Sequence, residues 1–206
     1  MRSVDNRRNG PRATARTFRI NKMAEAHLGG HLNITWIDKG ALVWCKDNLG
    51  IESVVDIGCG PGGMQAVCES LELDWLGVDG DPDMIKDENF LLCDFTKGSV
   101  DIGDGADLAW SIEFLEHVEE QYVPNFMKLF DKCDYAIVTA APPGTGGFHH
   151  VNEQPAEYWI DVFKTYGFYY NEERTEAIKK ASSMRHKKGN SWLGRRGMFF
   201  EKRENV

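Results

Sequence analysis

The chain alternates short apolar runs with segments whose apolar residues recur every three or four positions. The runs have the length of buried strands, and the segments have the period of amphipathic helices. Strands are predicted over residues 54–57, 75–78, 90–93, 108–111, 135–139, 168–170 and 197–201. Helices are predicted over residues 63–71, 118–130, 155–166 and 174–181. This alternation predicts a doubly wound α/β domain, in which helices cover both faces of a mostly parallel sheet.

The N-terminal part of the chain has two sections of different character. Residues 1–22 contain seven Lys or Arg residues and one acidic residue, and they show no periodicity. This pattern predicts a flexible basic segment. Residues 23–48 have apolar positions at helical spacing, which predicts one or two helices that cover the core. These positions include Leu32, Trp36, Leu42 and Trp44. A chain of 206 residues suits one domain, so residues 23–206 are expected to form a single domain.

Charge is distributed unevenly around the overall value of −8. The net charge is +6 over residues 1–22, −21 over residues 23–173 and +7 over residues 174–206. Basic ends suit a polyanion such as nucleic acid. We favour the alternative, in which the two basic segments are a solvated tail and a solvated loop whose positive charge offsets the negative charge of the middle of the chain. No apolar run approaches 18 residues and the Arg-rich N-terminus has no apolar stretch, so no membrane partner and no secretory signal are expected.

The cysteines give no sign of a disulfide framework or a metal site. Their number is five, and no two of them form a Cys-x-x-Cys pair. Zinc sites and disulfide-rich domains normally show paired spacings. The sequence therefore predicts reduced thiols in a cytoplasmic protein, and it leads us to expect no metal ligands.

A glycine-rich stretch follows the strand predicted at 54–57 and precedes a helix. Gly58, Gly60 and Gly63 satisfy the Gly-x-Gly-x-x-Gly pattern, in which the backbone turns tightly and approaches a ligand closely. The pattern alone fits a nicotinamide dinucleotide as well as S-adenosylmethionine.

Acidic residues at three successive strand ends favour the second cofactor. Asp56 lies just before the glycine loop, where a carboxylate would repel a pyrophosphate and attract a sulfonium or ammonium group. Asp79 ends the next strand, where a carboxylate can bind both hydroxyls of a ribose. Asp94 ends the third strand, and Phe95 follows it as a ring that can pack near an adenine.

Together these segments resemble the class I S-adenosylmethionine-dependent methyltransferases. The matching segments are residues 54–62, 77–81, 93–95 and 107–111. The Leu-Glu-His-Val run at 115–118 is typical of members that methylate small molecules and cofactor precursors. The resemblance spans about residues 50–201. It implies a Rossmann-like seven-stranded sheet, mostly parallel, whose antiparallel last strand is residues 197–201.

The resemblance also implies S-adenosylmethionine as cofactor, S-adenosylhomocysteine as product, and a role for each matching position. The methionine moiety would be held by Asp56, Gly58, Cys59, Gly60, Pro61 and Gly62. The ribose would be bound by Asp79 and Gly80, and the adenine would be framed by Asp94 and Phe95. The junction of cofactor and acceptor would be lined by residues 110–113, including Ser111 and Glu113.

Methyl transfer to an oxygen usually needs a general base such as histidine or a carboxylate. His150 and Glu153 follow the fifth predicted strand, at the sheet edge where parallel α/β proteins bind ligands. Their segment resembles the Gly-His-Val-Asn-Glu stretch of uncharacterised bacterial and phage methyltransferases. His117 in the Leu-Glu-His-Val run is a third catalytic candidate. Alternatively, the loop residues cap and brace the helix that follows.

Motifs of nucleic-acid methyltransferases are missing from the expected places. The fourth strand ends in Asp107-Leu108-Ala109-Trp110, without the Pro-Pro pair of enzymes that methylate exocyclic base amines. The sequence therefore favours O-methylation of a small-molecule or sugar-like acceptor. An RNA or protein methyltransferase that docks through the basic ends and a non-catalytic domain that binds the cofactor are the alternatives, so nucleic acid is a possible but unfavoured partner.

Overall fold

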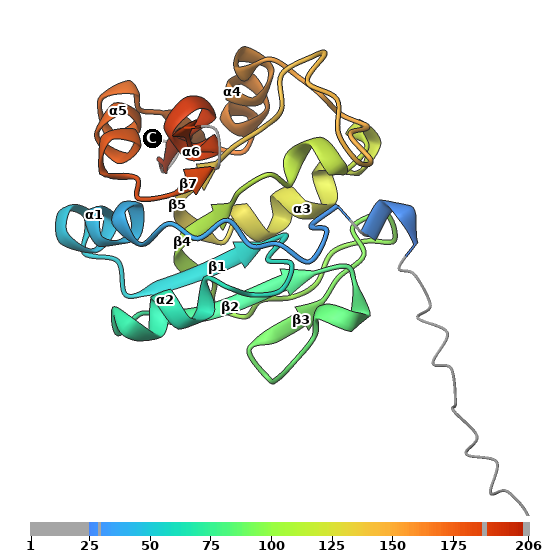
Figure 1. The fold of residues 1–206 in the computed structure, drawn as a ribbon, viewed down its shortest axis with the longest axis horizontal. Helices are drawn as coiled ribbons and strands as arrows, with labels where there is room; N and C mark the ends of the chain where they lie inside the picture. The colour runs from blue at the N-terminus through green and yellow to red at the C-terminus, as the bar shows by residue number, and fades with distance from the viewer. Residues whose placement is uncertain (1–24, 29, 187–188, 204–206) are drawn as a thin grey trace, which may run out of the picture.

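The computed structural model describes residues 25–28, 30–186 and 189–203, so the basic segment predicted at 1–22 lies outside the described residues. A seven-stranded sheet with the strand order β3-β2-β1-β4-β5-β9-β6 forms the centre of the molecule (Figure 1). Its strands are β1 Ser53–Ile57, β2 Asp74–Asp79, β3 Phe90–Leu92, β4 Ala106–Ser111, β5 Cys133–Val138, β6 Phe168–Tyr170 and β9 Met198–Lys202. Only β9 runs antiparallel to its neighbours, β5 and β6. This confirms the predicted Rossmann-like sheet with an antiparallel last strand.

Six α-helices of the described part of the chain pack against the two faces of this sheet (Figure 1). They are α1 Lys39–Leu49, α2 Gln65–Ser70, α3 Val123–Phe130, α4 Ala156–Thr165, α5 Glu172–Ala181 and α6 Trp192–Arg196. Helices α3 and α4 contribute to one hydrophobic core, and α1, α2, α5 and α6 contribute to the other. None of the helices in the described residues is long and apolar enough to cross a membrane.

Successive side chains of a strand point to opposite faces of the sheet, so neighbouring strand residues belong to different cores. Val55 of β1 belongs to the α3–α4 core, whereas its neighbour Val54 belongs to the opposite core. On β9, Phe200 stacks on Phe163 of α4 with 4.4 Å between ring centroids. The preceding Phe199 stacks on Tyr135 from the other face, at 5.7 Å. Both faces are therefore buried, as the near-continuous apolar strands require.

The segment before α1 departs from the prediction. The helices predicted over 23–48 are correct only for α1 and for a single 3-10 turn at Ala26–Leu28; residues 30–38 are not helical. Leu32 and Asn33 have φ angles of 47° and 58°, which interrupt a right-handed helix. The helix starts only after Asp38, whose buried carboxylate accepts the Ala41 N–H at 3.0 Å.

Smaller differences have local causes. Helix α3 begins at Val123 rather than 118, because Pro124 lacks an N–H and is tolerated only in the first turn. Helix α6 and the two-stranded hairpin of β7 Arg185–His186 and β8 Gly189–Asn190 were not predicted. The five cysteines are all buried and form no disulfide, as predicted.

We predict that Phe200→Ala lowers the free energy of unfolding by about 3–5 kcal/mol, because it removes a fully buried ring and leaves a cavity beside Phe163. Urea denaturation measures this change. Phe148→Ala makes the same chemical change at a ring that is 47% exposed, and should alter stability by less than about 0.5 kcal/mol. Equal effects of the two substitutions would contradict the core assignment.

Candidate functional site

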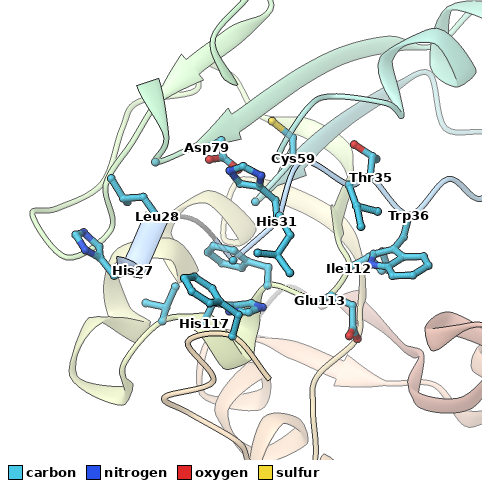
Figure 2. A pocket seen from close by; sticks show the side chains of 18 of the residues that line it. His27, Leu28, His31, Thr35, Trp36, Cys59, Asp79, Ile112, Glu113 and His117 are labelled. Atoms are coloured by element: carbon cyan, nitrogen blue, oxygen red, sulfur yellow. The ribbon is translucent and has the colours of Figure 1, made fainter. Parts of the chain in front are cut away.

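A cavity of about 310 Å³ lies at the carboxyl ends of β1, β2 and β4. The strands are parallel, so the loops that follow them meet at one edge of the sheet. A further wall is formed by residues 27–28, 30–32 and 34–36, here called the N-terminal segment. Figure 2 shows the side chains of His27, Leu28, His31, Thr35 and Trp36 alongside Asp79, Glu113 and His117. Ten of the predicted site residues line this cavity: Asp56, Gly58, Cys59, Asp79, Gly80, Asp94, Phe95, Glu113, His117 and His150.

The glycine loop between β1 and α2 is shaped by positions that accept no side chain. Gly58 has φ +77°, and a Cβ there would lie 2.3 Å from the Phe114 ring. Gly62 has φ +71°, and its Cβ would lie 2.4 Å from the Phe90 ring. Gly60, Pro61 and Gly62 complete the turn without lining the cavity. The first part of the loop therefore faces the cavity, and the rest of the loop fixes the conformation of the turn.

Two buried carboxylates face this loop. Oδ2 of Asp56 is buried and has no hydrogen-bond partner among the described residues. Asp79 accepts the Gly60 N–H at 2.8 Å on one oxygen and the Asp81 N–H at 2.9 Å on the other. Burial raises the pKa of Asp56 to about 7 and also raises the pKa of Asp79. A cation at this position would favour the ionised forms.

Asp94 is already well supplied with partners. Its Oδ2 contacts His27 Nε2 at 3.2 Å and Lys97 Nζ at 2.8 Å, and its Oδ1 accepts the Thr96 N–H at 3.0 Å and the Thr96 hydroxyl at 2.6 Å. Burial opposes ionisation, but Lys97, Thr96 and His27 hold the pKa of Asp94 below its usual range. An additional hydrogen bond to Asp94 requires His27 or Lys97 to give way.

Ser111 is the last residue of β4, Glu113 lies two residues beyond it, and their side chains have different surroundings. The Ser111 hydroxyl is fully buried, donates to the Ile57 carbonyl at 2.9 Å and does not line the cavity. Glu113 lines it with a strained backbone at φ 55°, where its N–H donates to Thr139 Oγ1 at 2.8 Å. Burial raises the pKa of the Glu113 carboxyl.

The three catalytic candidates form a linked group. The rings of His117 and His150 meet edge to face with centroids 4.9 Å apart, and both line the cavity. Glu153 does not line it; its carboxylate contacts His150 Nδ1 at 2.8 Å and accepts the N–H groups of Gly144 and Gly146 at 2.8 and 2.6 Å. Glu153 therefore orients His150 and shapes the loop. It does not cap α4, whose first turn follows Pro155.

Sequence reasoning missed the part of the site that the N-terminal segment supplies. His31 Nε2 contacts Asp81 Oδ2 at 3.2 Å, and Thr35 Oγ1 accepts the Gly63 N–H at 3.0 Å. With the His27–Asp94 contact, these bonds tie the segment to the ends of β2 and β3 and to the glycine loop. No periodic signal marks these residues. Glu116 was also missed, although it precedes His117 in the Leu-Glu-His-Val run.

Comparison with solved structures identifies the fold as that of the class I S-adenosylmethionine-dependent methyltransferases. Magnesium protoporphyrin IX methyltransferase from Synechocystis PCC 6803, solved with bound S-adenosylmethionine, matches 80% of this chain and 76% of its own, with a TM-score of 0.56 and 15% identity. A TehB-like methyltransferase from Corynebacterium glutamicum matches 81% and 89%, with a TM-score of 0.55 and 16% identity. The plantazolicin methyltransferase BpumL matches 80% and 83%, with a TM-score of 0.55 and 12% identity. No protein-family model and no curated protein matches the sequence.

The Asp56 carboxyl should make stability depend on pH. Its pKa of about 7 in the folded state lies above its ordinary value of 3.8, so the folded chain binds the proton more tightly than the unfolded chain between these values. The stability it contributes is present below about pH 4 and is lost as the pH rises through 7. We expect Asp56→Asn to gain about 2–3 kcal/mol relative to the wild type between pH 5 and pH 8, measured by urea denaturation.

The matched control is Asp74→Asn, which changes an exposed aspartate at the amino-terminal end of the neighbouring strand β2. Its stability relative to the wild type should not change between these two pH values. A pH-independent difference for Asp56→Asn would show that this carboxyl does not titrate in the folded protein as described.

Proposed function

We propose that this protein is an S-adenosylmethionine-dependent methyltransferase that methylates an oxygen of a small-molecule or sugar-like acceptor. The observation that carries the proposal is the pair of buried carboxylates, Asp56 and Asp79, beside the glycine loop. One oxygen of Asp56 has no hydrogen-bond partner within the described part of the chain, which suits a cationic ligand group. S-adenosylmethionine carries such groups, so the residues present fit this cofactor.

The binding roles follow from the acceptor capacity of each carboxylate. Each Asp79 oxygen accepts one backbone N–H and keeps a lone pair for a ribose hydroxyl. Asp56, Gly58 and Cys59 would hold the methionine moiety. Phe95 is buried in the cavity wall, edge to face with Phe114 at 5.6 Å between centroids, and would form the apolar side of the adenine site.

When bound, the cofactor supplies a methyl group for in-line displacement from its sulfonium. The protein then has to orient the acceptor hydroxyl and take up its proton. His150 has its Nδ1 held by Glu153, which leaves Nε2 to accept a proton and places a carboxylate to stabilise the imidazolium. Burial lowers the pKa of His117 to about 4, so its ring is neutral at pH 7 and acts as a hydrogen-bonding partner for the acceptor.

Calorimetric titration with S-adenosylmethionine and S-adenosylhomocysteine tests the cofactor. Asp79→Ala should weaken binding by about 1–3 kcal/mol, or about 5–150-fold, because it removes a buried charged hydrogen-bond partner. Asp74→Ala removes an exposed carboxylate from the other end of the same strand and should leave affinity unchanged. Failure of the wild-type protein to bind either ligand would contradict the proposal.

Turnover tests the acceptor side, measured as S-adenosylhomocysteine release with a panel of hydroxyl-bearing small molecules. For any acceptor that turns over, His150→Ala should lower kcat by about 10²–10⁴-fold while cofactor affinity stays within about twofold. An unchanged kcat would return His150 to a structural role. Binding of the cofactor without turnover on any acceptor would favour the non-catalytic alternative.

A further inference from the structure

Glu116, His117 and His150 converge at the cavity, where the turn after β4 meets the loop after β5; we call them the carboxylate–histidine cluster. One candidate ligand atom from each residue lies within 4.8 Å of those from the other two. His117 and His150 line the cavity, whereas Glu116 lies behind them and is fully buried. This spacing is close to the span of ligands around a single ion, whose bonds to nitrogen and oxygen are about 2.0–2.2 Å long.

The Glu116 carboxylate is the least expected member of the cluster. It is 0% exposed, and neither of its oxygens has a hydrogen-bond partner among the described residues. Arg196 is near enough to influence Glu116 electrostatically. Its buried Nη1 has no hydrogen-bond partner in the described ranges either, so Arg196 Nη1 and the Glu116 carboxylate do not bond to each other. Burying an ionised carboxylate without partners is costly, and a bound cation would offset that cost for the ionised form.

Both histidine rings are anchored in the way that metal ligands usually are. His117 Nδ1 is 3.2 Å from the His149 carbonyl oxygen, and His150 Nδ1 is 2.8 Å from the Glu153 carboxylate. A ligating histidine normally donates its other ring N–H to a carbonyl or a carboxylate, which fixes the tautomer and leaves the second nitrogen free. In both rings that second nitrogen is Nε2.

Glycine backbone also holds both rings. A Cβ at Gly147 would lie 2.3–2.7 Å from three atoms of the His150 ring, and one at Gly30 would lie 2.7–3.0 Å from three atoms of the His117 ring. Any side chain at these glycines would displace the rings.

Hydrogen bonds join the two loops that carry the cluster. The Glu116 carbonyl accepts the N–H groups of Val151 and Asn152 at 2.9 and 3.1 Å. The Asn152 side chain donates to the Val118 carbonyl at 3.1 Å. Together with the contact from His117 to His149, these bonds fix the turn after β4 against the loop after β5. The cluster is therefore preorganised rather than an accidental encounter of surface side chains.

We propose that Glu116, His117 and His150 bind one divalent transition-metal cation, with coordination positions left for an oxygen of the acceptor. Two imidazoles and a carboxylate form a mixed nitrogen and oxygen donor set, which suits Mn²⁺, Co²⁺ or Zn²⁺. Mg²⁺ and Ca²⁺, by contrast, prefer sites made of oxygen ligands alone. The cysteine spacings, on which the expectation of no metal rested, do not bear on such a site.

The role of the cation in the reaction rests on the proposed function. Three protein ligands leave room for an exogenous oxygen, as in catalytic metal sites. The cation would hold the acceptor hydroxyl beside His117 and His150, which line the cavity. In the metal-bound protein His117 and His150 would be ligands and Glu153 would position His150. The cation would acidify the acceptor hydroxyl, which would lose its proton to solvent, and the proton-accepting role of His150 described above would apply to the metal-free protein.

Calorimetry on the full chain after chelator treatment tests the site, with Mn²⁺, Co²⁺ and Zn²⁺ titrated separately. One equivalent should bind, Zn²⁺ and Co²⁺ more tightly than Mn²⁺ and all three more tightly than Mg²⁺. Glu116→Gln and His150→Gln should each weaken Co²⁺ binding at least tenfold and change the visible Co²⁺ spectrum. His149→Asn keeps the carbonyl that holds His117 and suits the φ of 52° at that position, so it should bind Co²⁺ like the wild type.

Cofactor binding is measured in the same samples, which separates the two proposals. Metal binding that all variants share equally, or no metal binding by a protein that still binds S-adenosylmethionine, overturns the metal site and leaves the proposed function standing. Stoichiometric metal binding without cofactor binding overturns the proposed function alone. Glu116→Gln is isosteric, and circular dichroism shows whether each variant is folded before it is compared.

Discussion

The burial of carboxylates at one edge of the sheet is the constraint on which the site depends. Asp56, Asp79, Glu113 and Glu116 all lie at the ends of β1, β2 and β4, and burial raises the pKa of each. Such groups destabilise a folded chain unless positive charge or hydrogen bonds compensate them. Backbone N–H groups serve Asp79 and a hydroxyl serves Glu113, but Glu116 and one oxygen of Asp56 have no such partner among the described residues. The pocket is therefore suited to cationic ligands.

The topology explains why these acids meet. Chain crossovers leave the sheet in opposite directions from β1 and β4, which are neighbours at its centre. A crevice forms at the carboxyl ends of such a pair, because the two following loops diverge there. Gly58 fits this crevice only because it has no Cβ against Phe114. The two cores on either side of the sheet keep the strand ends fixed, so the positions of the acids do not depend on a ligand being present.

The sequence predicts what local patterns determine. Strand period, the glycine loop and the acids at strand ends all depend on neighbouring residues, and the strands containing Asp56 and Asp79 were found in this way. Glu116 could not be found so, because the loop that fixes its backbone, through the N–H groups of Val151 and Asn152, lies some 35 residues away in the chain. The helix predicted over residues 30–38 is wrong for a similar reason: their apolar spacing is helical, but their conformation is set by contacts with Asp81 and Gly63. Long-range contacts of this kind leave no period in the chain.

The N-terminal segment covers the pocket with two histidines next to acidic residues. His27 and His31 contact Asp94 and Asp81 through their ring nitrogens, each at 3.2 Å. Asp94 already has a permanent cation beside it in Lys97, at 2.8 Å, so a lysine at position 27 would add a second one and compete with a positively charged ligand. The histidines thus close the wall of the cavity while leaving Asp94 able to exchange a bond to His27 for one to a bound ligand.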